Sequence, residues 1–331
     1  MFSYLRKTKV KVALIAITLY ICITSTTVAF SQTPTQLPNR ITIGVRTNIP
    51  VIGKYNKDTK TVEESFCYTF GQQLERELSQ INVGIIVDFD DVNNEGKGGE
   101  FPRFQGLRNG SHDIQCGSNS ISPRPGVIFS NPFYETGIKL MIKKEDFNQY
   151  LKKISGNNRI DLVKNEFKIA AEENTTTYRN LKNQGFNIQR YPSKDAALNA
   201  VISQPRIAFA DDAIILRSYL KEGYPGEIDF NQNDYIIFPE RSRDYVIETP
   251  EKYGIAISDT GEKSKYSQEL KNTINRVLET PSLEQERAKL QNYEDGAKFS
   301  QSSPARTPVL LFAIGFSAVA IILTLVAYRI K

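Results

Sequence analysis

The sequence predicts an α/β protein built from two lobes, and three observations lead to this fold class. From Ile41 onward, short apolar segments typical of strands alternate with segments of helical periodicity. This order is typical of α/β units with largely parallel sheets. The alternation repeats in the second half, and in each half a strand ends in a polar cluster: CGSNSISPR in the first, AEENTTT and AFADD in the second. We therefore expect two small α/β lobes rather than one large sheet.

The first half predicts strands and helices in a regular order. Apolar residues of FCYTFGQQLEREL recur at helical spacing, and the pair Asn109-Gly110 is typical of a helix end followed by a turn. His112 follows in this polar turn, where we expect it to be exposed. The predicted elements are strands 41–46, 82–90, 112–117 and 137–144, with helices over 66–78 and 102–110.

The second half repeats the pattern with clearer helix boundaries. Ser193 is a typical N-cap residue and Gly223 a typical residue after a helix end. Asp212 is expected to cap the helix that follows it, while Asp211 faces a cleft. The predicted strands are 167–172, 186–192, 206–212, 234–240 and 253–258, and the predicted helices are 175–185, 193–203, 213–223, 264–280 and 282–295.

Residues 1–31 have the layout of a secretory signal peptide. Four basic residues precede the apolar run Val12–Ile23, and small residues then allow cleavage near Ala29 or Ser31. The alternative is an uncleaved membrane anchor.

The uncharged run Val309–Ala327 predicts a transmembrane helix over residues 309–328, because it is long enough to cross a bilayer core. Arg329 and Lys331 follow it and place the C-terminus in the cytoplasm. Residues 297–308 are a polar linker. The expected location is therefore the inner (plasma) membrane, crossed once, with the folded body in the periplasm or another extracytoplasmic space.

The charge balance of the body argues against a nucleic acid partner. Six of the 42 basic residues lie in 1–31 and 307–331, which have no acidic residues, so residues 32–306 carry 36 basic and 37 acidic groups. The basic character belongs to the membrane flanks. Because export places thiols in an oxidising space, we expect Cys67 and Cys116 to form a disulfide, the alternative being two separate buried thiols.

The sequence offers a binding site more readily than a catalytic one. His112 is the single histidine, and no Cys/His spacing fits a metal, so we expect no enzyme activity, no cofactor and no metal. Arg124 could grip a carboxylate, with Ser120 donating beside it, or could be a surface arginine. Thr175 and Thr176 begin a helix and could bind an anion or simply cap it. Asp211 could hold an ammonium group or serve a helix start.

Taken together, the motifs resemble the type 3 extracellular solute-binding proteins, the periplasmic receptors for polar amino acids. RFQGLRNGSHDI is similar to the family's R-x-x-x-L-x-x-G-x-x-D, SNSISPR to T-I-T-x-x-R, and RIAFADDAIIL to D-A-x-x-x-D, in the family's order. The resemblance implies that Arg124 holds a ligand carboxylate with Ser120 and Thr175 or Thr176, and that Asp211 holds an amino group. Phe101 would pack on the ligand.

The resemblance also implies an organisation and a role. Lobe 1 would comprise 40–141 and 248–296, lobe 2 would comprise 142–247, and a small solute would be captured in the cleft of this periplasmic-binding-protein-like (type II) clamshell. The expected function is a membrane-tethered binding protein for the permease of an ABC-type importer. The alternatives are a sensing subunit that signals through a membrane partner and a dehydratase-like enzyme. Asn174 stands where the family has glycine, and the loop 122–129 is shorter, so a carboxylate ligand is expected more than a standard α-amino acid.

Overall fold

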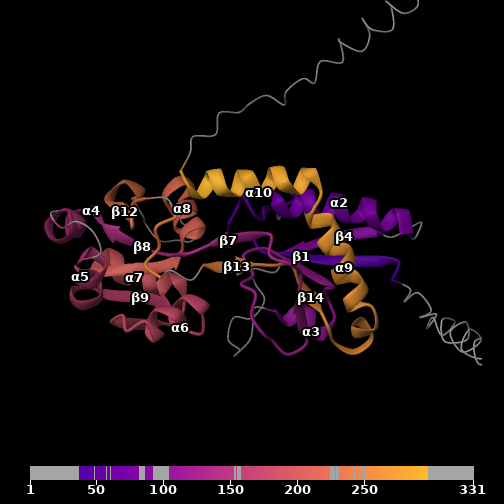
Figure 1. Cartoon of the computed structure of the whole chain (residues 1–331), viewed down its shortest axis with the longest axis horizontal. Helices are drawn as coiled ribbons and strands as arrows, with labels where there is room; N and C mark the ends of the chain where they lie inside the picture. Colours follow the sequence, from indigo (N-terminus) through magenta and orange to yellow (C-terminus); the bar gives the residue numbers. More distant parts are fainter. Residues whose placement is uncertain are drawn as a thin grey trace, which may run out of the picture.

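The computed structural model describes residues 37–296 except 48, 57, 60, 82–85, 92–103, 153, 155–157, 224–227, 229–230, 242 and 248–249. Its strands form two five-stranded sheets, one in each of two lobes (Figure 1). The predicted signal peptide, linker 297–308, transmembrane helix 309–328 and Phe101 lie outside the described residues. Within the described ranges, no helix combines the length and the apolarity needed to span a bilayer.

The first sheet has the strand order β4-β1-β5-β14-β6. β4, β1 and β5 are parallel, whereas β14 runs antiparallel to both β5 and β6. The helices α2 and α9 pack against each other over this lobe. The elements are β1 (Arg40–Val45), β2 (Tyr55–Asn56), β3 (Thr61–Val62), α2 (Phe66–Ile81), β4 (Ile86–Asp91), α3 (Gln105–Asn109), β5 (Ile114–Cys116), β6 (Val127–Phe129), β14 (Ala256–Ser258), η4 (Gly261–Lys265) and α9 (Ser267–Leu278).

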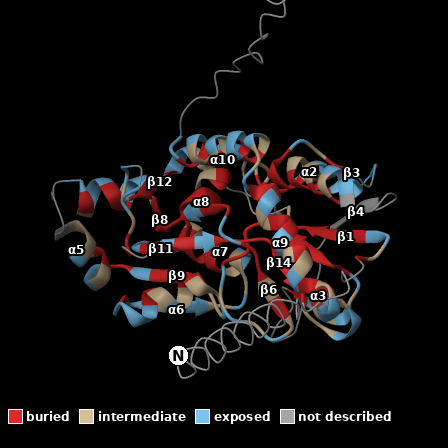
Figure 2. Cartoon of the chain, turned by 45° about the vertical axis from the view of Figure 1, so that its right-hand side comes forward, coloured by how far each residue is buried: buried red, intermediate tan, exposed pale blue. Residues whose placement is uncertain are grey.

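The second sheet has the strand order β10-β9-β11-β8-β12. β10, β9 and β11 are parallel, and β8 and β12 complete the sheet in antiparallel pairings. The elements are β8 (Ile138–Lys143), α4 (Lys144–Asp146), η2 (Phe147–Leu151), α5 (Asn158–Glu166), β9 (Lys168–Glu172), α6 (Thr176–Asn183), β10 (Ile188–Tyr191), α7 (Lys194–Ser203), β11 (Ile207–Asp212), α8 (Ala213–Glu222), η3 (Gln232–Asp234) and β12 (Tyr235–Phe238). The strands β5 and β14 of the first sheet and β8 and β11 of the second are largely buried (Figure 2).

Two short strands join the lobes. β7 (Tyr134–Thr136) leads from the first sheet to the second, and β13 (Glu251–Tyr253) returns beside it in an antiparallel pair (Figure 1). β8 begins right after Gly137, so the chain enters the second sheet earlier than the predicted boundary at residue 141. Gly137 allows this crossing to pack tightly, since an added Cβ would lie 2.2 Å from Cγ of Tyr245.

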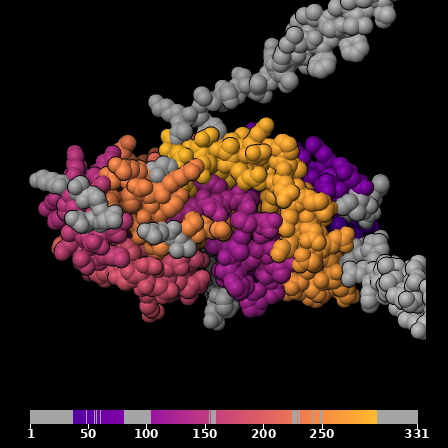
Figure 3. All heavy atoms as spheres, viewed as in Figure 1, coloured from indigo at the N-terminus to yellow at the C-terminus, as the bar shows by residue number. Residues whose placement is uncertain are grey.

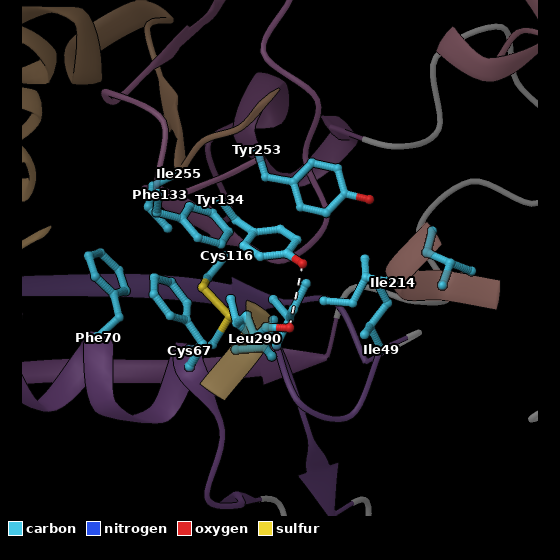
Figure 4. Close-up of a cluster of buried hydrophobic side chains, with 14 of the residues drawn as sticks. Ile49, Cys67, Phe70, Cys116, Phe133, Tyr134, Ile214, Tyr253, Ile255 and Leu290 are labelled. Carbon is cyan, nitrogen blue, oxygen red and sulfur yellow. Dashed lines mark hydrogen bonds between the residues drawn. A yellow bond between two sulfur atoms is a disulfide. The ribbon is translucent and has the colours of Figure 1, made fainter. Parts of the chain in front are cut away.

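The disulfide expected from the sequence is present. Cys67 of α2 and Cys116 of β5 are bonded at 2.08 Å, with a separation of 49 residues along the chain. The bond lies in the main core, near Phe133 and Tyr134 (Figure 4). In the same core Phe66 stacks on Phe133 at 4.3 Å between ring centroids. It therefore fastens the first helix of lobe 1 to the middle of its sheet.

The last described helix, α10 (Pro281–Glu294), lies across both lobes (Figure 3). It packs against α2 and α9 on one side and against α8 of the other lobe. Its final residue, Glu294, is buried and accepts hydrogen bonds from Tyr134 (2.7 Å), Thr136 (2.7 Å) and Tyr245 (2.9 Å). This carboxylate thereby joins the crossing strand β7 to a loop of the second lobe.

Glu294→Ala is expected to lower the free energy of unfolding by about 2–3 kcal/mol, because it leaves buried hydroxyl donors without an acceptor. Urea denaturation measures this change. Glu284→Ala is the matched control, since Glu284 is exposed on the same helix. Equal stabilities of the two variants would contradict the role of Glu294 as a buried acceptor.

Candidate ligand-binding site between the lobes

The candidate site lies where strands of both sheets end near the crossing strands. In the first sheet the chain leaves β5 through Gly117–Ser120, and in the second sheet β11 ends in Asp211 and Asp212. Ligands of open α/β sheets bind at the carboxyl ends of such strands. The geometry therefore brings the serine loop and the aspartate pair, predicted from separate halves of the sequence, to one region.

Ser120 is buried and held by the crossing strand β13. Its Oγ donates to Oε2 of Glu251 at 2.7 Å, and its backbone pairs with Tyr253. The backbone N–H of Ile121 donates to Lys252 O at 2.8 Å, and that of Gly254 donates to Asn119 O at 3.0 Å. The serine loop is thus fastened to the strand through which the lobes are connected.

Tyr253 and Asp212 form a direct hydrogen bond between the lobes. The Tyr253 hydroxyl of β13 donates to Oδ2 of Asp212 at the end of β11, and both residues are buried. The predicted capping role of Asp212 is wrong: it occupies the N-cap position of α8, but its side chain makes no capping bond. The reason is that this carboxylate is turned toward Tyr253. Burial raises the pKa of Asp212 well above its usual range, and the charges of Glu251 and Asp211 raise it further.

The raised pKa of Asp212 makes stability depend on pH. The folded state favours the protonated carboxyl, so its contribution is fully present below the unfolded pKa of about 3.9 and is lost as pH rises through the folded pKa. Asp212→Asn cannot ionise, and we expect it to be more stable than wild type at pH 8, by at least about 1 kcal/mol.

Thermal melts between pH 4 and pH 8 test this expectation. The advantage of Asp212→Asn should shrink toward pH 4. The exposed Asp161→Asn serves as control, and it should show no such trend. An advantage of Asp212→Asn that does not change with pH would contradict the burial of an ionisable group at this position.

Asp211 is paired with Lys194, a residue that the sequence analysis missed. Lys194 Nζ lies 2.5 Å from Asp211 Oδ2, and the backbone N–H of Asp212 donates to Asp211 Oδ1 at 3.0 Å. Lys194 is the first residue of α7, whose N-cap Ser193 accepts from Ala196 N as predicted. A cation at the positive end of a helix is unfavourable. That misplaced charge was the signal from which Lys194 could have been found.

The threonines at the start of α6 (Thr176–Asn183) have different environments. Thr175 caps the helix, accepting from Tyr178 N at 3.1 Å and donating to Glu172 O at 2.7 Å. Thr176 has a buried Oγ1 without a hydrogen-bond partner among the described residues. Asn174 before them has φ 63°, a left-handed backbone that glycine or asparagine adopts readily. Of the two candidates, Thr175 thus caps the helix, whereas the side chain of Thr176 makes no capping bond.

Arg124 and Arg46, two arginines of the first lobe, lie in separate surroundings. Arg124 Cζ lies 5.2 Å from the ring centroid of Phe104, next to the small core around α3. Arg46, which follows β1, was missed; its Nη1 donates to Ser118 O at 3.2 Å and to Ser118 Oγ at 3.4 Å. It is the last residue of the predicted strand 41–46, and a cation at the end of a predicted strand was the signal for it.

His112 does not have the predicted exposure. It is 5 % exposed, and its backbone N–H donates to Gly106 O at 3.0 Å. The turn is bonded back to α3, and the Ser111 hydroxyl lies 3.3 Å from Nδ1 of the buried imidazole. The next residue, Asp113, accepts from Lys263 (2.7 Å) and Tyr266 (2.7 Å), so this polar turn is part of the packing of lobe 1.

No family model matches the chain, and no curated protein matches its sequence. Solved structures do match. One is an ancestral amino acid-binding protein that is a precursor of cyclohexadienyl dehydratase, with 21% identity, a TM-score of 0.52, and coverage of 78% of this chain and 96% of that one. A second is an ancestral arginine-binding protein bound to glutamine, with 19% identity, a TM-score of 0.53, and coverage of 80% and 100%.

A third is an amino acid ABC transporter substrate-binding protein from Streptococcus pneumoniae bound to L-arginine, with 14% identity, a TM-score of 0.52, and coverage of 78% and 96%. The chain has the two-lobed fold of these proteins. The predicted two-lobed α/β fold is therefore confirmed.

Proposed function

We propose that the chain is a solute-binding protein that captures a small carboxylate-bearing or amino-acid-like ligand between its lobes and delivers it to an ABC-type importer. The observation that carries this proposal is the convergence of strand ends on the crossing strands. Ser120–Glu251 and Tyr253–Asp212 connect the serine loop, β13 and β11 by buried hydrogen bonds. These bonds link the two lobes next to the strand ends, and we expect a solute that enters between the lobes to change them.

The arrangement suits reversible closure of two lobes. The lobes are joined by the short β7–β13 pair, with α10 lying over both. A ligand that contacts both lobes stabilises the closed state by the difference in its affinity for the two states. In the proposed protein, residues 309–328 would tether the body to the inner membrane on its extracytoplasmic side, beside the permease.

A thermal-shift screen of the purified full chain tests the proposal. The compounds are amino acids, small organic acids and amines, each in large excess. At 100 times its Kd, a ligand of the folded state adds about 2.7 kcal/mol of stability, which raises Tm by several degrees. We expect a shift with at least one carboxylate compound. A flat response to every compound would contradict a solute-binding role.

A further inference from the structure

We propose that Lys194 is a built-in counter-ion that occupies the position of a ligand ammonium group at Asp211, so that the site selects carboxylic acids without an α-ammonium group. This inference rests on the proposed solute-binding function and concerns the class of ligand. The structural basis is the Lys194–Asp211 ion pair at 2.5 Å, at the end of the strand where the resemblance places the amino-group contact.

The ion pair is well shielded and uses both oxygens of Asp211. The Asp211 side chain is 8 % exposed and that of Lys194 is 22 % exposed. Oδ2 faces the ammonium group, and Oδ1 accepts from the backbone of Asp212 at 3.0 Å. An ammonium group of a ligand would therefore have to displace Lys194 before it could reach this carboxylate.

The other buried acids beside Asp211 also have donors within the protein. Asp212 accepts from the Tyr253 hydroxyl, and Glu251 accepts from Ser120 at 2.7 Å. Burial raises the pKa of Asp212, which favours its neutral form. Burial acts to lower the pKa of Lys194, but the charges of Asp211 and Glu172 outweigh it and raise that pKa, so the lysine keeps its charge.

The charged Lys194 ammonium group beside Asp211 discriminates between ligands by their charge. Lysine carries three N–H donors and no acceptor. Beyond its bond to Asp211, it can donate to the hydroxyl or keto oxygen of a 2-hydroxy or 2-oxo acid. The α-ammonium group of an amino acid in the same place would be repelled by the positive charge of Lys194.

Calorimetric titration of the full chain with matched ligand pairs tests the inference. Each pair consists of an L-amino acid and the 2-hydroxy acid of the same side chain. For wild type we expect tighter binding of the hydroxy acid. In Lys194→Met the buried Asp211 lacks its counter-ion, and we expect affinity for the amino acid to rise about 10-fold or more relative to the hydroxy acid.

Two further variants and one control complete the design. Lys194→Gln keeps a polar side chain beside Asp211 and should show the same change, which covers the case that Lys194→Met does not fold. Lys194→Arg keeps the cation and should retain the wild-type preference. Lys168→Met is the control. Lys168 is an exposed lysine at the start of β9, at the edge of the sheet opposite to the strand ends that carry Asp211.

The outcomes separate the two levels of the proposal. Wild-type preference for the amino acids, with no change in Lys194→Met or Lys194→Gln, would overturn the role of Lys194 and leave the solute-binding function standing. The absence of binding by every pair to wild type and to all variants would contradict the proposed function itself. A reversal of preference in the two neutral variants alone supports the inference.

Discussion

Arg124→Ala is expected to abolish measurable ligand binding while leaving the protein folded. The resemblance described above implies that Arg124 holds the ligand carboxylate, and its guanidinium can do so with two parallel hydrogen bonds. Such charge-assisted bonds each contribute about 1.5–3 kcal/mol, so their loss lowers affinity by roughly 100-fold or more. Calorimetry with the acid that gives the largest thermal shift measures the effect.

The fold should tolerate this change because Arg124 is only partly buried, on the face of Phe104. Arg76→Ala is the charge-matched control, since Arg76 is exposed on α2 of the same lobe. Unchanged affinity in Arg124→Ala would remove Arg124 from the site. The arginine at the end of β1, Arg46, would then be the next candidate for the carboxylate contact.

Replacing Cys67 and Cys116 together with serine is expected to lower the free energy of unfolding by about 4 kcal/mol. The bond closes a loop of 49 residues, and in the chain-entropy account its removal frees the unfolded chain by this amount. Denaturation of the oxidised wild type and the double variant gives the difference. We expect a correspondingly lower Tm.

A reducing agent provides the control for the disulfide prediction. It should destabilise wild type toward the level of the double variant and leave the double variant unchanged. If wild type is equally stable with and without the reductant, the bond does not constrain the unfolded chain as the loop length implies.

The alternation of strands and helices could be predicted because the periodicity of apolar residues and the capping residues are local features of the sequence. Ser193, for example, is the N-cap residue of α7, and Gly223 directly follows the last residue of α8, as predicted. The sheets are less parallel than expected. β8 and β14 are the strands that follow the two crossings, and both enter their sheet antiparallel to a neighbour. No local sequence pattern predicts the direction of these strands, because that direction depends on how the chain connects the two lobes.

The candidate site was predictable only at the positions that end strands. Ser120 and Asp211 could be found because each follows an apolar run. The position of Lys194 at a helix start marks it as unusual, but its pairing with Asp211 could not be predicted. The pairing of Glu251 with Ser120 could not be predicted either, since these contacts join residues 17 and 131 positions apart in the chain. The capping role expected of Asp212 fails for the same reason, because a distant tyrosine provides the stronger donor.

Closure of the lobes around a ligand is the central claim, and a distance measured across them tests it most directly. Spin labels at the exposed residues Gln105 and Lys182 report that distance by pulsed electron resonance. These residues belong to α3 and α6, the helices of the two lobes that both lie toward the bottom of the molecule in Figure 1. A saturating concentration of the acid with the largest thermal shift should give a shorter and narrower distance distribution. Identical distributions with and without that acid would contradict the account.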